Sequence, residues 1–170
     1  PAEFGPGEFK RGTEEIDPAT TKNVKWVVKL GSQAYGNPTA AGGRIFVGTN
    51  NESPRDPKHE GDRGVVFCLE EATGKLLWQL VVPKLGAGKV SDWEYLGICS
   101  SPTVDGDRVF ALGTEGDLVS LDATTGEEGW RRSLRRDLGG AQMLAQGTTT
   151  WKYSESVLVE IDRGDAAALR

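Results

Sequence analysis

Two closely related segments that end in tryptophan constrain the fold of this chain more than any other feature. The first runs from Cys68 to Trp78 and reads Cys-Leu-Glu-Glu-Ala-Thr-Gly-Lys-Leu-Leu-Trp. The second runs from Ser120 to Trp130 and reads Ser-Leu-Asp-Ala-Thr-Thr-Gly-Glu-Glu-Gly-Trp. A weaker copy, beginning at Asp17, leads to Trp26. Once insertions are allowed for, the core repeat is about 40 residues long, which is typical of repeat architectures.

Each repeat contains four short β-branched or aromatic segments separated by Gly, Asn, Asp or Thr-Gly turns. The 23 glycines suit the turn positions between such strands. Four antiparallel strands in a repeat of this length are typical of one β-propeller blade. We therefore expect an all-β fold, a fragment of a β-propeller with four-stranded antiparallel blades. The expected strands are 36–41, 44–49, 64–70 and 75–82, followed by 98–104, 107–113, 117–122 and 128–134.

The repeats also predict how the 170 residues are organised. Extra residues lie inside the first unit and between the two units, and both ends of the chain are less regular. We expect six segments: a flexible lead-in over 1–14, the end of a preceding blade over 15–35, a blade over 36–82 with an insertion near 50–61, an inter-blade insertion over 83–97, a second blade over 98–136, and an incomplete blade over 137–170.

Composition excludes several classes of protein. Two cysteines, Cys68 and Cys99, and one histidine, His59, make neither a disulfide framework nor a His-rich metal site. A net charge of -5 argues against nucleic-acid binding, and the basic run from Arg131 to Arg136 fits a solvated strand edge. No apolar stretch approaches the roughly 20 residues that span a bilayer. The chain begins at Pro1, and no signal peptide is visible.

The repeated segments resemble the tryptophan-docking motif of the pyrroloquinoline-quinone (PQQ)-type β-propeller repeat, Ala-x-Asp-x-x-Thr-Gly-Lys/Glu-x-x-Trp. Cys68 and Glu70 replace Ala and Asp in the first copy, and Ser120 replaces Ala in the second. The resemblance covers about residues 15–160 and implies a parent propeller of eight blades, in the periplasm or at the cell surface. It implies that a tryptophan packs between blades and that the Thr-Gly turn shapes the hairpin. The docking residues carried over in this way are Trp26, Gly74, Trp78, Gly126 and Trp130.

The resemblance leaves two functions open, because the family contains quinoprotein dehydrogenases and non-catalytic propellers that assist outer-membrane protein assembly. The quinoprotein alcohol dehydrogenases are expected to carry two adjacent cysteines, whereas Cys68 and Cys99 are far apart. No residue here matches their catalytic or calcium-binding motifs, so we assign no catalytic and no metal residue. We therefore favour a non-catalytic, cofactor-free module that binds or scaffolds a protein or small ligand. The alternative is a fragment of a PQQ- and calcium-dependent alcohol or sugar dehydrogenase.

Two aromatic clusters are the candidate binding residues. They occur just before the strand that opens a blade, where connections line one mouth of a propeller channel, and they are Trp93, Glu94, Tyr95, Trp151, Tyr153 and Glu155. Aromatic rings beside a carboxylate suit a peptide, a sugar or a quinone ring. Packing between blades is the alternative role of the same rings. The expected partners are the remaining blades of the parent propeller and a protein or peptide.

Overall fold

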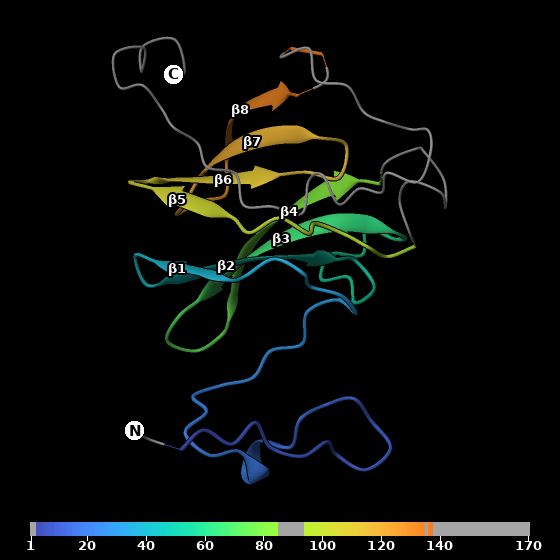
Figure 1. Ribbon diagram of the computed structural model, residues 1–170, viewed down its shortest axis with the longest axis vertical. Coiled ribbons are helices and arrows are strands. Elements are labelled where there is room, and N and C mark those ends of the chain that lie inside the picture. Colours follow the sequence, from blue (N-terminus) through green and yellow to red (C-terminus); the bar gives the residue numbers. More distant parts are fainter. Residues whose placement is uncertain (1–2, 85–93, 135, 138–170) are drawn as a thin grey trace.

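The strands observed in the computed structural model form two separate four-stranded sheets (Figure 1). The structure describes residues 3–84, 94–134 and 136–137. The first sheet has the order β1-β2-β3-β4 and the second β5-β6-β7-β8, and every neighbouring pair is antiparallel. The strands are β1 (Thr39–Ala41), β2 (Arg44–Asn50), β3 (Arg63–Glu70), β4 (Leu76–Pro83), β5 (Thr103–Asp105), β6 (Arg108–Leu112), β7 (Asp117–Asp122) and β8 (Glu128–Ser133).

The two sheets repeat the same register. In the first, Phe46 of β2 pairs with Cys68 of β3, which pairs with Trp78 of β4. In the second, the corresponding residues are Phe110, Ser120 and Trp130. A register shift follows Cys68 in one sheet and Ser120 in the other. The all-β expectation of four-stranded antiparallel blades is therefore confirmed.

The Thr-Gly turn of each motif connects the third strand to the fourth. Gly74 and Gly126 have φ values of 74° and 76°, a conformation in which a side chain is strained. The Gly126 amide donates to the Asp122 carbonyl at 2.9 Å. The Asp122 carboxylate also accepts from the amides of Thr125 and Thr124, each at 2.8 Å. These bonds stabilise the charged form and hold the pKa of Asp122 below its usual value.

Successive side chains of a strand point to opposite faces of a sheet. In the first sheet, apolar residues lie on both of these faces. Phe46 and Cys68 face the second sheet, where they pack with Val109, Val119 and Leu121. The opposite face carries a different cluster, covered by the segment 26–30, and its buried members are Val47, Val65, Phe67 and Leu69. The segment 26–30 therefore occupies the side of the sheet on which a preceding blade is expected.

The longer connections gather at one end of the sheets. The β2–β3 connection lies at the end opposite the tight β1–β2 and β3–β4 turns, as the meander requires (Figure 1). The chain enters β1 and β5 from the same end as the β2–β3 connection. We call this end the loop face and define it by the segments 31–38, 51–62 and 94–102.

The strands that open each sheet are shorter than the sequence predicts. A strand was expected over 98–104, but β5 contains only Thr103–Asp105. The residues before it bond across to other segments: the Ile98 amide donates to the Thr49 carbonyl at 3.1 Å, and the Ser100 hydroxyl to the Leu112 carbonyl at 3.1 Å. Residues 96–102 therefore connect the sheets instead of extending β5.

Residues 3–23 fold back on themselves, away from the two sheets (Figure 1). Isolated antiparallel bridges join Gly5 to Lys22 and Phe9 to Ile16. The single-turn helix η1 (Pro18–Thr20) begins after Asp17, whose side chain accepts from the Ala19 amide at 3.0 Å. Within the described parts of the chain, no helix is long and apolar enough to cross a membrane.

Candidate functional site

The loop face is organised around Asn50, the last residue of β2, which is only 1% exposed. Its Oδ1 accepts from the amides of Ser32 and Glu52, each at 3.1 Å. Its Nδ2 donates to the Ser32 hydroxyl at 2.9 Å and to the Tyr95 carbonyl. Both donors and both acceptor positions of the amide are thus satisfied. One buried side chain therefore joins all three segments of the loop face.

Thr49 makes a parallel set of bonds beside Asn50. Its hydroxyl donates to the Gln33 carbonyl at 2.8 Å and accepts from the Gly31 amide at 3.0 Å. The approach is close enough to require glycine at two positions. A Cβ on Gly31 would lie 2.0 Å from the Asn50 Oδ1, and one on Gly97 would lie 2.5 Å from the Thr49 carbonyl oxygen. Segments 31–38 and 94–102 are therefore packed closely against the end of β2.

Tyr95 has a left-handed backbone with a φ of 56°, which is unfavourable for a residue with a Cβ. Its amide donates to Asp62 Oδ2 at 2.7 Å, and its carbonyl accepts from Asn50. Asp62 also binds the Lys84 ammonium at 2.6 Å. These bonds hold Tyr95 in place and present the exposed Glu94 beside it.

The structure therefore locates two of the six predicted binding residues, Glu94 and Tyr95, on the loop face. The remaining four lie outside the described residues, and these are Trp93, Trp151, Tyr153 and Glu155. Sequence reasoning missed Asn50 and Asp62, which bond to the Tyr95 backbone, and Ser32, which bonds to Asn50. The available signal was the run of side-chain oxygens in the expected insertion near 50–61, which begins at Asn50.

The predicted docking residues meet in pairs across neighbouring units. The Trp26 Nε1 donates to the Glu71 carbonyl at 2.9 Å, and a Cβ on Gly74 would lie 2.7 Å from its ring. In the next unit, the Trp78 Nε1 donates to the Ala123 carbonyl at 3.3 Å, and its ring lies over Gly126. Each ring thus covers the Thr-Gly turn of the unit that follows it.

Trp130 is the third predicted docking tryptophan that the structure describes. Its ring centroid lies 5.9 Å from that of Phe110 in the same sheet. The equivalent pair in the first sheet, Phe46 and Trp78, is 5.8 Å apart. The two tryptophans therefore have equivalent positions within their own sheets.

The titratable groups of the described residues form no metal centre: no three His, Cys, Asp or Glu side chains gather there. Cys68 is fully buried between the sheets, and this burial raises the pKa of its thiol to about 11, although the charge of Arg44 opposes the shift. Such a thiol stays protonated near neutral pH and packs as an apolar group.

Comparison with known proteins identifies one family. The family model described as outer membrane protein assembly factor BamB matches residues 62–169. The protein of that name from Aliivibrio fischeri is 30% identical over 98 residues, which cover 56% of this chain and 22% of that protein. The one from Nitrosomonas eutropha is 26% identical over 162 residues, covering 76% of this chain and 36% of that protein.

A solved structure is also similar, the crystal structure of BamB from Moraxella catarrhalis. The two chains are 24% identical. The match covers 68% of this chain and 28% of the Moraxella catarrhalis chain, with a TM-score of 0.47. The chain thus spans between 22% and 36% of the length of the curated relatives named above.

Proposed function

Because the chain belongs to the family described as outer membrane protein assembly factor BamB, we propose that it is a non-catalytic propeller module that binds a protein partner. The proposed role is in outer-membrane protein assembly, which is the role named for its relatives. Binding would use the loop face, with Glu94 and Tyr95 among the contacting residues.

The observation that supports this site is the constrained backbone of Tyr95. A left-handed conformation at a residue with a Cβ costs roughly 1–2 kcal/mol and persists only when its surroundings hold it. Here Asn50 and Asp62 bond to its carbonyl and amide. A loop that is held in this way loses little conformational entropy when a partner binds, which favours recognition.

The proposal places the protein in the periplasm or at the cell surface, where outer-membrane assembly takes place. It also assigns no cofactor to the module. A protein that scaffolds an assembly supplies a rigid surface and charge complementarity, and neither requires a redox group. The competing quinoprotein function would instead require saturable binding of PQQ and calcium.

Site-specific photo-cross-linking tests this proposal. A photoreactive amino acid replaces Glu94, the protein is expressed in the envelope of a Gram-negative host, and the adducts are identified by mass spectrometry. The matched control places the same group at Thr73, an exposed residue of the turn at the opposite end of the first sheet. We expect position 94, but not position 73, to cross-link to proteins of outer-membrane assembly.

Two results would contradict the proposal. Equal cross-linking at positions 94 and 73 would show that the loop face is not a selective surface. Saturable binding of PQQ in the presence of calcium, with dye-linked oxidation of an alcohol, would favour the quinoprotein function instead.

A further inference from the structure

The Asp62 carboxylate binds both ends of the connection that leads from the first sheet to the second. Its Oδ2 accepts from the Lys84 ammonium at 2.6 Å and from the Tyr95 amide at 2.7 Å. Lys84 directly follows the last residue of β4, and Tyr95 precedes the residues that lead into β5. A single carboxylate oxygen therefore holds the two ends of this connection together.

Strand pairing places Asp62 beside Lys84. Arg63 and Pro83 form the last pair of the β3–β4 register at this end, so Asp62 and Lys84 continue the two strands just beyond it. Side chains at such opposed positions lie close enough to form an ion pair. The Asp62 side chain is 19% exposed and that of Lys84 is 25% exposed, so solvent screens this pair less than it screens a pair on the open surface.

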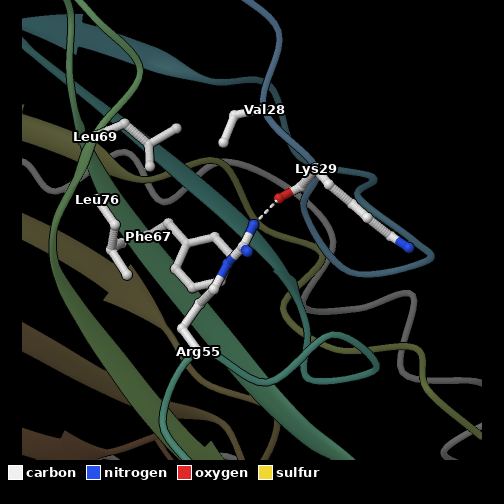
Figure 2. Close-up of a pocket in the computed structure, with 6 residues that line it drawn as sticks. All are labelled: Val28, Lys29, Arg55, Phe67, Leu69 and Leu76. Atoms are coloured by element: carbon white, nitrogen blue, oxygen red, sulfur yellow. Dashed lines mark hydrogen bonds between the residues drawn. The ribbon is translucent and has the colours of Figure 1, made fainter. Parts of the chain in front are cut away.

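The loop 51–62, which carries Asp62, is held against the first sheet by Arg55. The Arg55 guanidinium lies over the Phe67 ring, 5.8 Å from its centroid, and donates to the Lys29 carbonyl (Figure 2). These groups line a cavity of about 180 Å³ on the face of the sheet that does not meet the second sheet. Because the loop is anchored there, the Asp62 carboxylate is presented from a fixed position.

The backbone of Tyr95 depends on such a fixed acceptor. Its φ of 56° is a left-handed conformation, which a residue with a Cβ keeps only when its surroundings hold it. Asn50 binds the carbonyl of Tyr95, and Asp62 binds the amide. A hydrogen bond to a charged acceptor is about twice as strong as one between neutral groups. Without the Asp62 carboxylate, we expect Tyr95 to populate extended conformations and to reorient the exposed Glu94 beside it.

We propose that Asp62 is the positioning residue of the loop face. Its carboxylate, oriented by Lys84, selects the left-handed conformation of Tyr95 in which Glu94 meets the partner protein. The physical basis is pre-organisation: the loop is held in its binding conformation before the partner arrives, so less conformational entropy is lost on binding. This role rests on the proposed function, because it requires that the partner contacts Glu94.

Hydrogen exchange of individual amides, followed by NMR on the ¹⁵N-labelled 170-residue chain, tests the positioning step without a partner. Asp62→Ala should speed exchange of the Tyr95 amide about tenfold, because this amide loses a charged acceptor. The Ile98 amide, which donates to the Thr49 carbonyl from the same segment, is the internal control and should keep its rate. Glu60→Ala removes an exposed carboxylate from the same loop and should leave both rates unchanged.

Photo-cross-linking from position 94 tests the consequence for binding. Asp62→Asn keeps the side-chain shape and an acceptor oxygen but removes the charge. We expect the yield of the adducts that the native chain forms to fall about threefold in this variant and in Lys84→Gln. The double variant should be no worse than Asp62→Asn alone, because both changes act through one carboxylate. Lys84→Arg keeps the charge and should retain most of the yield, and Glu60→Gln should retain all of it.

Three outcomes would overturn the proposal. One is an unchanged exchange rate of the Tyr95 amide in Asp62→Ala. Another is equal acceleration at Tyr95 and Ile98, which would show that the whole segment loosens. The third is a full yield of adducts from position 94 in Asp62→Asn, which would leave the proposed function intact. A native chain that forms no adducts from position 94 would instead overturn the proposed function, and with it the binding role of Asp62, even where exchange at Tyr95 responds as expected.

Discussion

The indole ring of Trp78 lies across Gly126 of the following sheet so closely that a Cβ on this glycine would come within 2.6 Å of the ring. Gly126 also has a positive φ of 76°. Two independent physical constraints therefore require glycine at this position: the backbone conformation and the tryptophan above it. Trp26 and Gly74 have the same relationship one unit earlier.

Gly126→Ala should lower the free energy of unfolding by more than the backbone strain alone would lower it. The left-handed conformation costs about 1 kcal/mol, and displacing the Trp78 ring adds roughly 1–3 kcal/mol. Gly106→Ala is the control, because Gly106 has a φ of 58° but no atom within 4 Å of the added methyl group. Urea unfolding measures both variants, and equal losses would contradict the role of the ring.

Trp78→Ala should destabilise the protein by about 3 kcal/mol, since it removes a large ring from the contact between the sheets. Leu77→Ala changes the neighbouring residue, which is 42% exposed, and should cost less than about 1 kcal/mol. We also expect Trp78→Ala to cost more than Trp93→Ala, whose site lies outside the described residues. A larger loss for Trp93 in thermal or urea unfolding would reverse the assignment of packing and binding roles.

Asn50→Asp should strongly destabilise the packing of the three loop-face segments around residue 50. The change replaces the donor to the Tyr95 carbonyl and the Ser32 hydroxyl by a buried oxygen that carries a charge. We expect a loss of about 3 kcal/mol in the free energy of unfolding. Asn37→Asp is the matched control at an exposed position and should change it by less than about 0.5 kcal/mol. Similar losses in the two variants would argue against the Asn50 junction.

The Cys68 thiol predicts a pH dependence in the alkaline range. Burial raises its pKa to about 11 in the folded protein, whereas a thiol in the unfolded chain titrates near about 8.5. The unfolded chain therefore loses this proton first, and stability falls by about 1.4 kcal/mol for each pH unit between these values. The difference in unfolding free energy between the native chain and Cys68→Ala, measured at several pH values, isolates this effect. A pH-independent difference would contradict it.

Gln79→Met should stabilise the first sheet. The Gln79 Oε1 is buried, and no donor in the described part of the chain reaches it. Removing an unsatisfied buried acceptor while keeping side-chain volume should raise the free energy of unfolding by about 1 kcal/mol. The control is Gln33→Met, because the Gln33 Oε1 accepts from the Tyr35 hydroxyl at 3.0 Å and should give no gain. A loss of stability in Gln79→Met would show that this oxygen has a partner.

The sequence alone was sufficient to predict the sheets because their determinants are local. The Thr-Gly turn at Gly74 and Gly126 defines a hairpin within a few residues, and alternating apolar residues define which face of a strand is buried. The residues near the start of each sheet were harder to predict. The repeat pattern predicts a strand over residues 98–104, yet the hydrogen bonds of residues 98–102 join them to Thr49, Leu112 and Asn37. Hydrogen bonds to partners this distant in the sequence cannot be predicted from a local pattern of residues.

In the candidate site, too, some features follow from the local sequence and others depend on long-range contacts. The repeat, the turn glycines and the position of Glu94 and Tyr95 before a blade-opening strand can all be predicted from the order of the residues. Only the tertiary structure brought Asn50 and Asp62 to the backbone of Tyr95, and Arg55 to the cavity beside Val28. Periodicity reports how a chain pairs with its near neighbours, whereas a buried amide or a cation over an aromatic ring depends on segments that only the folded sheets bring together.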